Sequence, residues 1–472
     1  MQDEDALREV AKDCVHCGFC LPACPTYQLW GQEMDSPRGR IYLVNEILDG
    51  AALSDTAAEH FDRCLGCMAC MTACPSGVQY DQLIEAARVW TEDARSGVQP
   101  AVGQGGRAAQ ASADDAAVAD VRGAEPGTGP APAVPSVLPA GRRSVRDRVA
   151  RKAIFSLFPY PRRLRALTAP LRTAQRTGLH RRLARSTLPG RVSPSLGAAL
   201  RLAPPAATVR PLPERVTALG PRRAVVGMLT GCVQSVFFPQ VNASTARVLA
   251  AEGCDVIIPR GQGCCGALSL HAGREAEAAA FARRTIVAFE QAGVDAIVVN
   301  SAGCGSAMKE YERLLAGEDG WAGRGAELSA KVSDLAEFIA ELGPVARRHP
   351  LPVTAAYHDA CHLAHAQGIT RQPRELLRAI PGLTLVELAD AGTCCGSAGV
   401  YNLLQPEAAG ELGERKAESV LASGAPLLIS ANPGCTLQIA SALAARGQQV
   451  AVAHTAEILD ASIRGLPVSL FT

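Results

Sequence analysis

The stretch CVHCGFCLPACP, residues 14–25, and its near repeat CLGCMACMTACP, residues 64–75, decide how the first part of this chain folds. Each stretch carries three cysteines at intervals of three residues, then a fourth cysteine and a proline. Bacterial proteins use this C-x2-C-x2-C-x3-C-P spacing to hold cubane iron–sulfur clusters, and the fourth cysteine of each run binds the other cluster. The two runs therefore predict a domain with two [4Fe-4S] clusters, over residues 1–95.

This crossed pattern assigns four cysteines to each cluster. The first cluster takes Cys14, Cys17, Cys20 and Cys74, and the second takes Cys64, Cys67, Cys70 and Cys24. Structural zinc is the alternative, but zinc is usually held by two separated pairs of cysteines or histidines rather than by three evenly spaced cysteines and a distant fourth. Between the runs, Ile41, Val44, Ile47 and Leu48 follow a helical period, so we expect a mostly helical domain.

Composition favours a soluble or peripheral protein. Of its 472 residues 48% are hydrophobic, and the formal net charge is +1. The start, MQDEDALREVAKD, is acidic and unlike an export signal, and no apolar run approaches the roughly 18 residues that span a bilayer. We therefore expect a cytoplasmic protein without a transmembrane segment. In that reducing compartment, 17 cysteines favour metal ligation over disulfides.

Two segments of unusual composition follow the cysteine runs. Residues 96–141 are rich in Ala, Gly and Pro and lack aromatic residues, so we expect a disordered linker. Residues 142–220 form a basic connector, expected to be partly helical, in which positions 142–215 hold 17 Arg and one Lys against two acidic residues. Because no nucleic-acid motif accompanies them, the arginines favour docking on an acidic subunit or an anionic membrane. The alternative, which the sequence supports equally, is that these arginines lie on the surfaces of ordinary helices and bind no partner.

The rest of the chain is an internal repeat, with a first copy at 221–345 and a second at 350–468. Each copy carries a Cys-Cys-Gly triplet, so we call the copies the first and second CCG modules. In both, strands alternate with helices and the cysteines follow the strands, which predicts a parallel α/β sheet with its thiolates gathered at one edge. The expected ligands are Cys232, Cys264, Cys265 and Cys304 in the first module and Cys361, Cys394, Cys395 and Cys435 in the second.

Two features of the first module have no ligand role in this interpretation. Cys254 corresponds to Leu383 in the second module, so we expect it to be a buried spare thiol. The loop GQGCCG matches a dinucleotide-binding fingerprint, but its counterpart AGTCCG keeps the cysteines and loses the glycine pattern. We therefore assign no flavin or nicotinamide site to this chain.

The order of these motifs resembles a known family. Two ferredoxin runs with a long insert, followed by two CCG modules, are similar to the iron–sulfur subunit of glycolate dehydrogenase (glycolate oxidase), of the cysteine-rich-domain family. The phrases YHDACHLAHAQGI, NSAGCG and SANPGC carry the likeness to this branch. Heterodisulfide reductase and the iron–sulfur subunits of anaerobic glycerol-3-phosphate dehydrogenase and of lactate utilisation share its parts. The resemblance covers about residues 5–95 and 150–466.

The resemblance implies an electron-transfer subunit of an oxidoreductase complex. FAD-binding sister subunits would oxidise glycolate or another 2-hydroxyacid, and this chain, peripheral on the inner face of the cell membrane, would pass the electrons to quinone or another membrane acceptor. We expect no catalytic residue and no substrate oxidation in the isolated chain. The alternatives are a lactate or glycerol-3-phosphate dehydrogenase subunit and heterodisulfide-reductase-like chemistry. Ser301 and Asn432 stand where the reductase modules carry a fifth cysteine, which counts against disulfide cleavage.

Three histidines distinguish the second module. His358, His362 and His365 are spaced to share one face if their stretch is helical, and Leu229, Val233 and Val236 are their counterparts in the first module. Three roles stay open: a zinc site, proton handling beside an exit to quinone, and hydrogen bonds to the sulfurs of a cluster. Together with the four cysteines they favour the second module as the better cluster site. We expect one or two further clusters in the modules.

Overall fold

The computed structural model describes residues 4–98, 102, 140–206 and 211–471. The predicted linker at 96–141 therefore falls almost wholly outside the described residues, and its disorder stays a prediction. The described part combines a helical N-terminal domain with two small parallel sheets, so the expected α+β multi-domain class is confirmed. None of the helices in these ranges is both long and apolar enough to cross a membrane.

The ferredoxin-like domain, residues 4–98, is built from short capped helices. Ser36 and Ser54 accept hydrogen bonds from backbone amides in the first turns of two of them, and prolines begin two. Val44, Phe61 and Leu83 lie in its core. Its elements are α1 (Glu4–Lys12), α2 (Pro25–Trp30), η1 (Glu33–Asp35), α3 (Pro37–Leu48), α4 (Asp55–Arg63), α5 (Ala69–Thr72) and α6 (Tyr80–Ser96).

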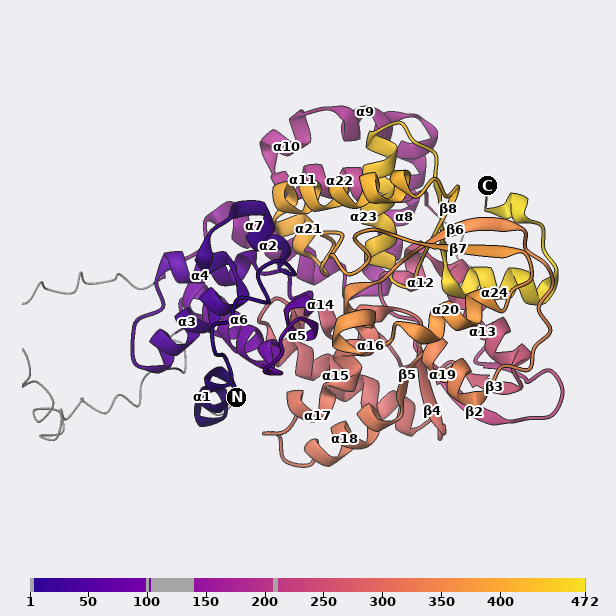
Figure 1. Ribbon diagram of the computed structural model, residues 1–472, viewed down its shortest axis with the longest axis horizontal. Helices are drawn as coiled ribbons and strands as arrows, with labels where there is room; N and C mark the ends of the chain where they lie inside the picture. Colours follow the sequence, from indigo (N-terminus) through magenta and orange to yellow (C-terminus); the bar gives the residue numbers. More distant parts are fainter. Residues whose placement is uncertain (1–3, 99–101, 103–139, 207–210, 472) are drawn as a thin grey trace, which may run out of the picture.

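The basic connector forms five helices that lie over the ferredoxin-like domain and the second module (Figure 1). Arg143 and Arg151 do not face solvent: both are ion-paired to Glu92, at 3.1 and 2.9 Å, and Arg143 also binds Asp62. Two of the arginines thus bind this chain's own acidic residues. The helices are α7 (Val145–Leu157), α8 (Pro161–Arg176), α9 (Leu179–Arg185), α10 (Leu188–Val192) and α11 (Pro194–Leu202).

The first CCG module has a five-stranded sheet of order β1-β3-β2-β4-β5, parallel except for β1. Its strands are β1 (Arg215–Val216), β2 (Ala224–Met228), β3 (Cys254–Ile257), β4 (Ala296–Val299) and β5 (Val332–Asp334). Its helices are α12 (Gln234–Phe237), α13 (Pro239–Ala251), α14 (Ala267–Leu270), α15 (Glu275–Glu290), α16 (Ala302–Lys309), α17 (Tyr311–Leu314), α18 (Ala322–Ala330) and α19 (Leu335–Leu342).

The second CCG module repeats this topology in a four-stranded parallel sheet of order β7-β6-β8-β9. Its strands are β6 (Val353–His358), β7 (Leu383–Glu387), β8 (Leu427–Ser430) and β9 (Ala451–His454). Its helical segments are η3 (His362–Ala366), α20 (Arg371–Arg378), α21 (Tyr401–Leu404), α22 (Pro406–Ala422), α23 (Pro433–Ala445), α24 (Thr455–Arg464) and η4 (Val468–Leu470).

The two modules share one hydrophobic core. Val226 and Val256 of the first sheet belong to the same buried cluster as Tyr357 and Ile429 of the second. Helix α13 packs on α24, where Arg247 binds Asp460 at 2.6 Å. The modules are therefore one packed unit in which the cysteine-bearing edges of the sheets are held at fixed positions.

Candidate metal centres

The two ferredoxin runs fold into the same loop. His16 and Gly18 in the first run have positive φ, and so do Gly66 and Met68 at the equivalent positions of the second. Side chains other than glycine rarely adopt this left-handed conformation, yet each run contains one that does, His16 in the first and Met68 in the second, which indicates a backbone conformation that the cysteine loop requires. Cys14, Cys17, Cys20 and Cys74 line one small cavity, as the ligands of a cubane cluster must.

The two groups of four cysteines differ in exposure. Of the group expected to hold the first cluster, Cys17 is exposed, and Cys14, Cys20 and Cys74 are partly buried. The group for the second cluster, Cys24, Cys64, Cys67 and Cys70, is buried throughout. The first site is therefore open to solvent or to a partner, and the second lies inside the protein.

Two buried arginines lie beside the second site. Burial opposes the ionisation of Cys64, but the Arg40 and Arg88 guanidinium groups outweigh it and lower the pKa of this thiol. Arg88 also donates to the Cys64 carbonyl oxygen at 2.6 Å, and the Tyr80 hydroxyl lies 3.6 Å from the Cys64 sulfur. Cationic and hydroxyl groups at this position suit an anionic thiolate-ligated cluster. Sequence analysis missed these residues, since nothing in their local pattern sets them apart from surface residues.

In each CCG module the four cysteines are brought together as two pairs. In the second module, the Cys361 sulfur lies 3.9 Å from that of Cys394. Hydrogen bonds from Cys394 and Cys435 hold the pKa of Cys395 well below its ordinary value. The first module has the same pairing: Cys264 with Cys232, and Cys265 with Cys304. Reduced, closely spaced thiols of this kind are a donor set that fits an iron–sulfur centre.

The glycine of each triplet is required by packing. Gly266 and Gly396 have φ of 91° and 87°. A Cβ on either would lie within 3.0 Å of a backbone oxygen, that of Ala278 or Ala409. Only glycine lets the cysteine loop press this closely against the following helix.

The two cysteine groups face the same cavity of about 200 Å³. Seven of the eight module cysteines line it, and Cys395 lies next to this lining. Ser301 and Asn432, at the start of α16 and α23, meet here with their side-chain oxygens 3.4 Å apart. The cavity lining is mainly apolar, and Phe158 and Leu202 of the connector contribute to it.

The second ferredoxin site adjoins the second module. Cys67 belongs to the same small hydrophobic cluster as Cys361. Burial, followed by the nearby Cys361 thiolate, raises the pKa of Cys67 well above its ordinary value. The Tyr401 hydroxyl donates to the Arg63 carbonyl oxygen at 3.0 Å across the same contact. Two predicted metal sites from separate domains are thus neighbours.

The stretch with the three histidines is not one helix, so the condition for the predicted shared face is not met. His358 ends strand β6, and only His362 and His365 belong to the short π-helical turn that follows. Strand β6 extends through His358, so its ring points in a direction that helical spacing does not predict. The His362 Nδ1 lies 3.5 Å from the Cys361 sulfur, whereas His365 bonds to Thr72 and to the Gly392 carbonyl oxygen.

One histidine that sequence analysis missed lies beside them. The His271 ring centroid lies 4.8 Å from that of His362, with the two rings tilted by 47°, and burial lowers the pKa of His271 well below the ordinary value. It comes from the first module, at the end of α14, so no spacing rule links it to the other three.

Comparison with known proteins agrees with this arrangement. A 4Fe-4S dicluster domain model matches residues 10–78, a cysteine-rich domain model matches 226–309 and 355–440, and a model of the linker region of glycolate oxidase iron–sulfur subunits matches 146–203. The chain is 33% identical to the probable glycolate oxidase iron–sulfur subunit of Bacillus subtilis, over 95% of this chain and 93% of that protein. The chain belongs to the family of glycolate oxidase iron–sulfur subunits.

Further members and relatives extend the likeness. The glycolate oxidase iron–sulfur subunit of Escherichia coli is 33% identical over 96% of this chain and 94% of its own length. Lactate utilization protein A of an Exiguobacterium species is 32% identical over 51% of this chain and 98% of its own length. The predicted resemblance to the glycolate oxidase iron–sulfur subunit is therefore confirmed, and the chain is an iron–sulfur oxidoreductase subunit.

Proposed function

We propose that this subunit carries electrons from FAD-binding dehydrogenase subunits, which oxidise glycolate, to a quinone in the membrane. The observation that carries the proposal is that the predicted cluster sites lie next to one another, one after the next, through the molecule. The exposed first ferredoxin site is where electrons would enter, the buried second site comes next, and the Cys67–Cys361 neighbourhood leads to the second module. The iron–sulfur clusters supply the redox chemistry, while the chain fixes their order and shields the inner ones.

The cavity between the modules is the proposed exit. Its lining combines apolar side chains, among them Phe158, Leu202 and Leu403, with cysteines of both modules. A quinone ring is flat and mainly apolar, so such a lining suits it. Its reduction takes up two protons, and His362 lies at the cavity to supply a proton, because the Cys361 thiol outweighs the effect of burial and raises the pKa of this histidine. Ser301 and Asn432 in place of thiols make disulfide cleavage at this site the weaker candidate.

The connector is the proposed membrane-docking surface. Its helices expose Leu179, Leu183, Leu188 and Val192 among the arginines. Interfacial helices that bind anionic membranes combine apolar and basic side chains in this way. Because Phe158 and Leu202 of the same connector line the cavity, docking through this surface would place the mouth of the cavity near the bilayer.

Iron counting and electron transfer test the relay. Anaerobically reconstituted full-length chain should contain at least about eight irons and eight sulfides for the two ferredoxin sites, and about twelve or sixteen irons if one or both modules hold a cube. Dithionite-reduced chain should then reduce a soluble quinone analogue, and Cys361→Ser should slow this step without emptying the ferredoxin sites. Zinc in place of iron, or glycolate oxidation by the flavin-free chain, would contradict the proposal.

Vesicle binding tests the docking surface. The chain should sediment with vesicles that contain phosphatidylglycerol and not with pure phosphatidylcholine. Replacing Arg181 and Arg185 by Glu should weaken binding by about tenfold or more, since each basic residue near an anionic surface contributes about 1 kcal/mol. Arg347 and Arg371 carry the matched control replacements, because both are exposed and lie outside the connector. If both pairs of replacements weakened vesicle binding equally, the connector arginines would have no specific role in docking.

A further inference from the structure

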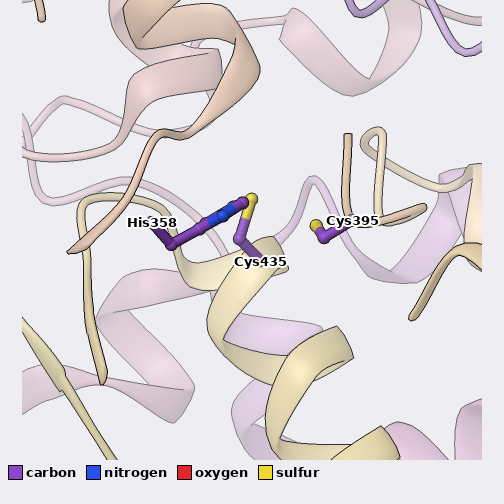
Figure 2. A group of neighbouring side chains, drawn as sticks. All are labelled: His358, Cys395 and Cys435. Atoms are coloured by element: carbon purple, nitrogen blue, oxygen red, sulfur yellow. The ribbon is translucent and has the colours of Figure 1, made fainter. Parts of the chain in front are cut away.

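We propose that His358 binds the metal centre of the second CCG module directly through a ring nitrogen, so that the two modules hold chemically different centres. The inference rests on the proposal that this module holds an iron–sulfur centre. Figure 2 shows the three side chains involved: His358 and Cys435 converge, and Cys395 faces them from the opposite loop.

The three side chains come from three different strand ends of one sheet. His358 is the last residue of β6, Cys395 follows β7 in the triplet loop, and Cys435 lies in the first turn of α23 after β8. One ligand atom of each, a ring nitrogen and two sulfurs, lies within 4.8 Å of the others. All three residues are buried. The topology of a parallel sheet therefore delivers an imidazole and two thiols to a single point.

The hydrogen bonding of His358 supports ligation. Its side chain is 1% exposed, and within the described residues neither ring nitrogen makes a hydrogen bond. A buried polar group without a partner costs roughly 1–3 kcal/mol, so such groups are rare unless something else satisfies them. A metal bond to one nitrogen would do so.

His454 provides an internal comparison. It ends strand β9 of the same sheet, as His358 ends β6, and it is equally part of the interior. Its Nδ1 accepts from the Ala456 amide at 3.0 Å, and its Nε2 lies 2.9 Å from the Asn300 carbonyl oxygen. A structural histidine in this fold thus has both nitrogens occupied by backbone groups, whereas His358 has neither paired and one of them close to the Cys395 and Cys435 sulfurs.

The first module lacks this ligand. Leu229 corresponds to His358. It is also buried, and it directly follows strand β2. In the second module, the side-chain amide of Asn432 donates to the Cys435 sulfur at 3.4 Å. Asn432 therefore stabilises the Cys435 thiolate and is not itself a ligand. The first module therefore offers thiolates alone, and the second offers thiolates with one imidazole.

A neutral imidazole in a ligand set otherwise made of thiolates changes the redox properties of an iron–sulfur centre. A cube has four irons to be ligated, so His358 would take the place of one of the four thiolates, and histidine in place of thiolate raises the reduction potential because the iron keeps less negative charge around it. The second-module centre should then have the more positive potential of the two. Electrons that arrive from the second ferredoxin site next to Cys361 would collect there.

Selective labelling tests the ligand. Full-length chain with 15N-labelled histidine is reconstituted anaerobically, reduced, and measured by pulsed electron paramagnetic resonance. We expect a strong nitrogen coupling that changes from the 14N to the 15N pattern on labelling and is lost in His358→Leu, which copies the first module. His362→Ala and His365→Ala should retain it. A coupling that survives in His358→Leu, or is absent from the parent chain, overturns the proposal.

Two further variants separate the possible failures. In His358→Cys a thiolate replaces the imidazole, so the iron content should be kept while the coupling disappears and the reduction potential shifts to a more negative value. This variant also serves if His358→Leu fails to fold. Cys395→Ser tests the centre itself: if it keeps every iron, the second module holds no centre and the relay through it is wrong. If it loses iron while His358→Leu keeps the coupling, only the ligand role of His358 is wrong.

Discussion

At the scale of single residues, the charge balance around the second ferredoxin site depends on Arg40. Its guanidinium is fully buried and donates to the Asp35 carbonyl oxygen at 2.6 Å and the His60 carbonyl oxygen at 2.7 Å. The Asp35 carboxylate, 0% exposed, lies against it. A buried charge that loses its partner typically costs about 3–5 kcal/mol, much more than a surface pair contributes.

We therefore expect Arg40→Met to lower the free energy of unfolding by about 3 kcal/mol, because Arg63 and His60 still contact Asp35 and keep the loss at the lower end. The cluster next to Cys64 should also become harder to reduce, since a nearby positive charge is lost. Denaturant unfolding and redox titration measure these effects. Arg415→Ala is the control, since it removes an exposed pair with Glu411 worth only about 0.3–0.5 kcal/mol. Equal losses in the two variants would contradict this view of Arg40.

Cysteines and arginines differ in how well a sequence reveals their role. Metal-binding cysteines occur at spacings that the cluster dictates, so all sixteen candidate ligands could be named from the sequence. In the structure the members of each predicted group lie near one another. Arg40 and Arg88 act through tertiary burial, which depends on helices that meet only in the folded domain. The stretch SPRGR begins an ordinary helix, and nothing in it predicts that the side chain of Arg40 is buried.

At the scale of elements, helix α6 of the ferredoxin-like domain meets α17 of the first module around one guanidinium. Arg313 binds Glu85 at 2.7 Å, and it also contacts Asp81 and Glu310. Burial, followed by the nearby Glu310 carboxylate, raises the pKa of Glu85 from 4.5 to about 8. The folded state thus holds a proton on Glu85 that the unfolded state releases at a much lower pH.

Because the folded protein binds more protons than the unfolded chain between about pH 4.5 and 8, this carboxyl makes the fold less stable as the pH rises through that range. Glu85→Gln removes the titration. Its stability relative to the parent should increase with pH by on the order of 3 kcal/mol, most of it reached by pH 8. Unfolding midpoints measured at pH 6, 7, 8 and 9 test this. Glu312→Gln, which removes an exposed carboxyl from α17, is the control. A pH-independent difference between Glu85→Gln and the parent would refute the shift.

Element prediction succeeded where periodicity was strong and failed where elements were short. The three strands expected in each module are present as β2, β3, β4 and β6, β7, β8. The fourth parallel strand of each sheet, VSD in β5 and AVAH in β9, was not predicted, since so few residues carry no readable alternation. The helical interpretation of the histidine stretch failed for a related reason: spacings of four and then three residues also fit a strand that runs into a turn.

At the scale of the whole molecule, the order of the sites could not be predicted from the sequence. Motif spacing reveals which cysteines act together, but it says nothing about which domain surface packs on which. The contact that places Cys67 beside Cys361 depends on residues as distant as Arg63 and Tyr401. The common core of the two modules likewise forms from both sheets and appears only when they are folded together.

This order leads to a prediction about oxidative damage. Ferricyanide or oxygen must reach a cluster to destroy it, and the first ferredoxin site has an exposed ligand, Cys17, with the exposed Phe19 and Val15 beside it. The second site has four buried ligands and lies against the second module. Limited oxidation should therefore remove the first cluster well before the second, with about four irons released in the fast phase.

Electron paramagnetic resonance with iron analysis at successive times follows the loss. Cys17→Ser should lack the fast phase, because its weakened first cluster is already missing or unstable. Tyr401→Phe is the complementary variant, because it removes the hydroxyl that donates to the Arg63 carbonyl oxygen and so weakens the contact between the second site and the second module. The slow phase should become faster in this variant, and the fast phase should be unchanged. If both ferredoxin clusters were instead lost at one rate in the parent chain, exposure would not control their lifetimes. Exposure would then no longer support the first site as the place where a flavoprotein partner delivers electrons.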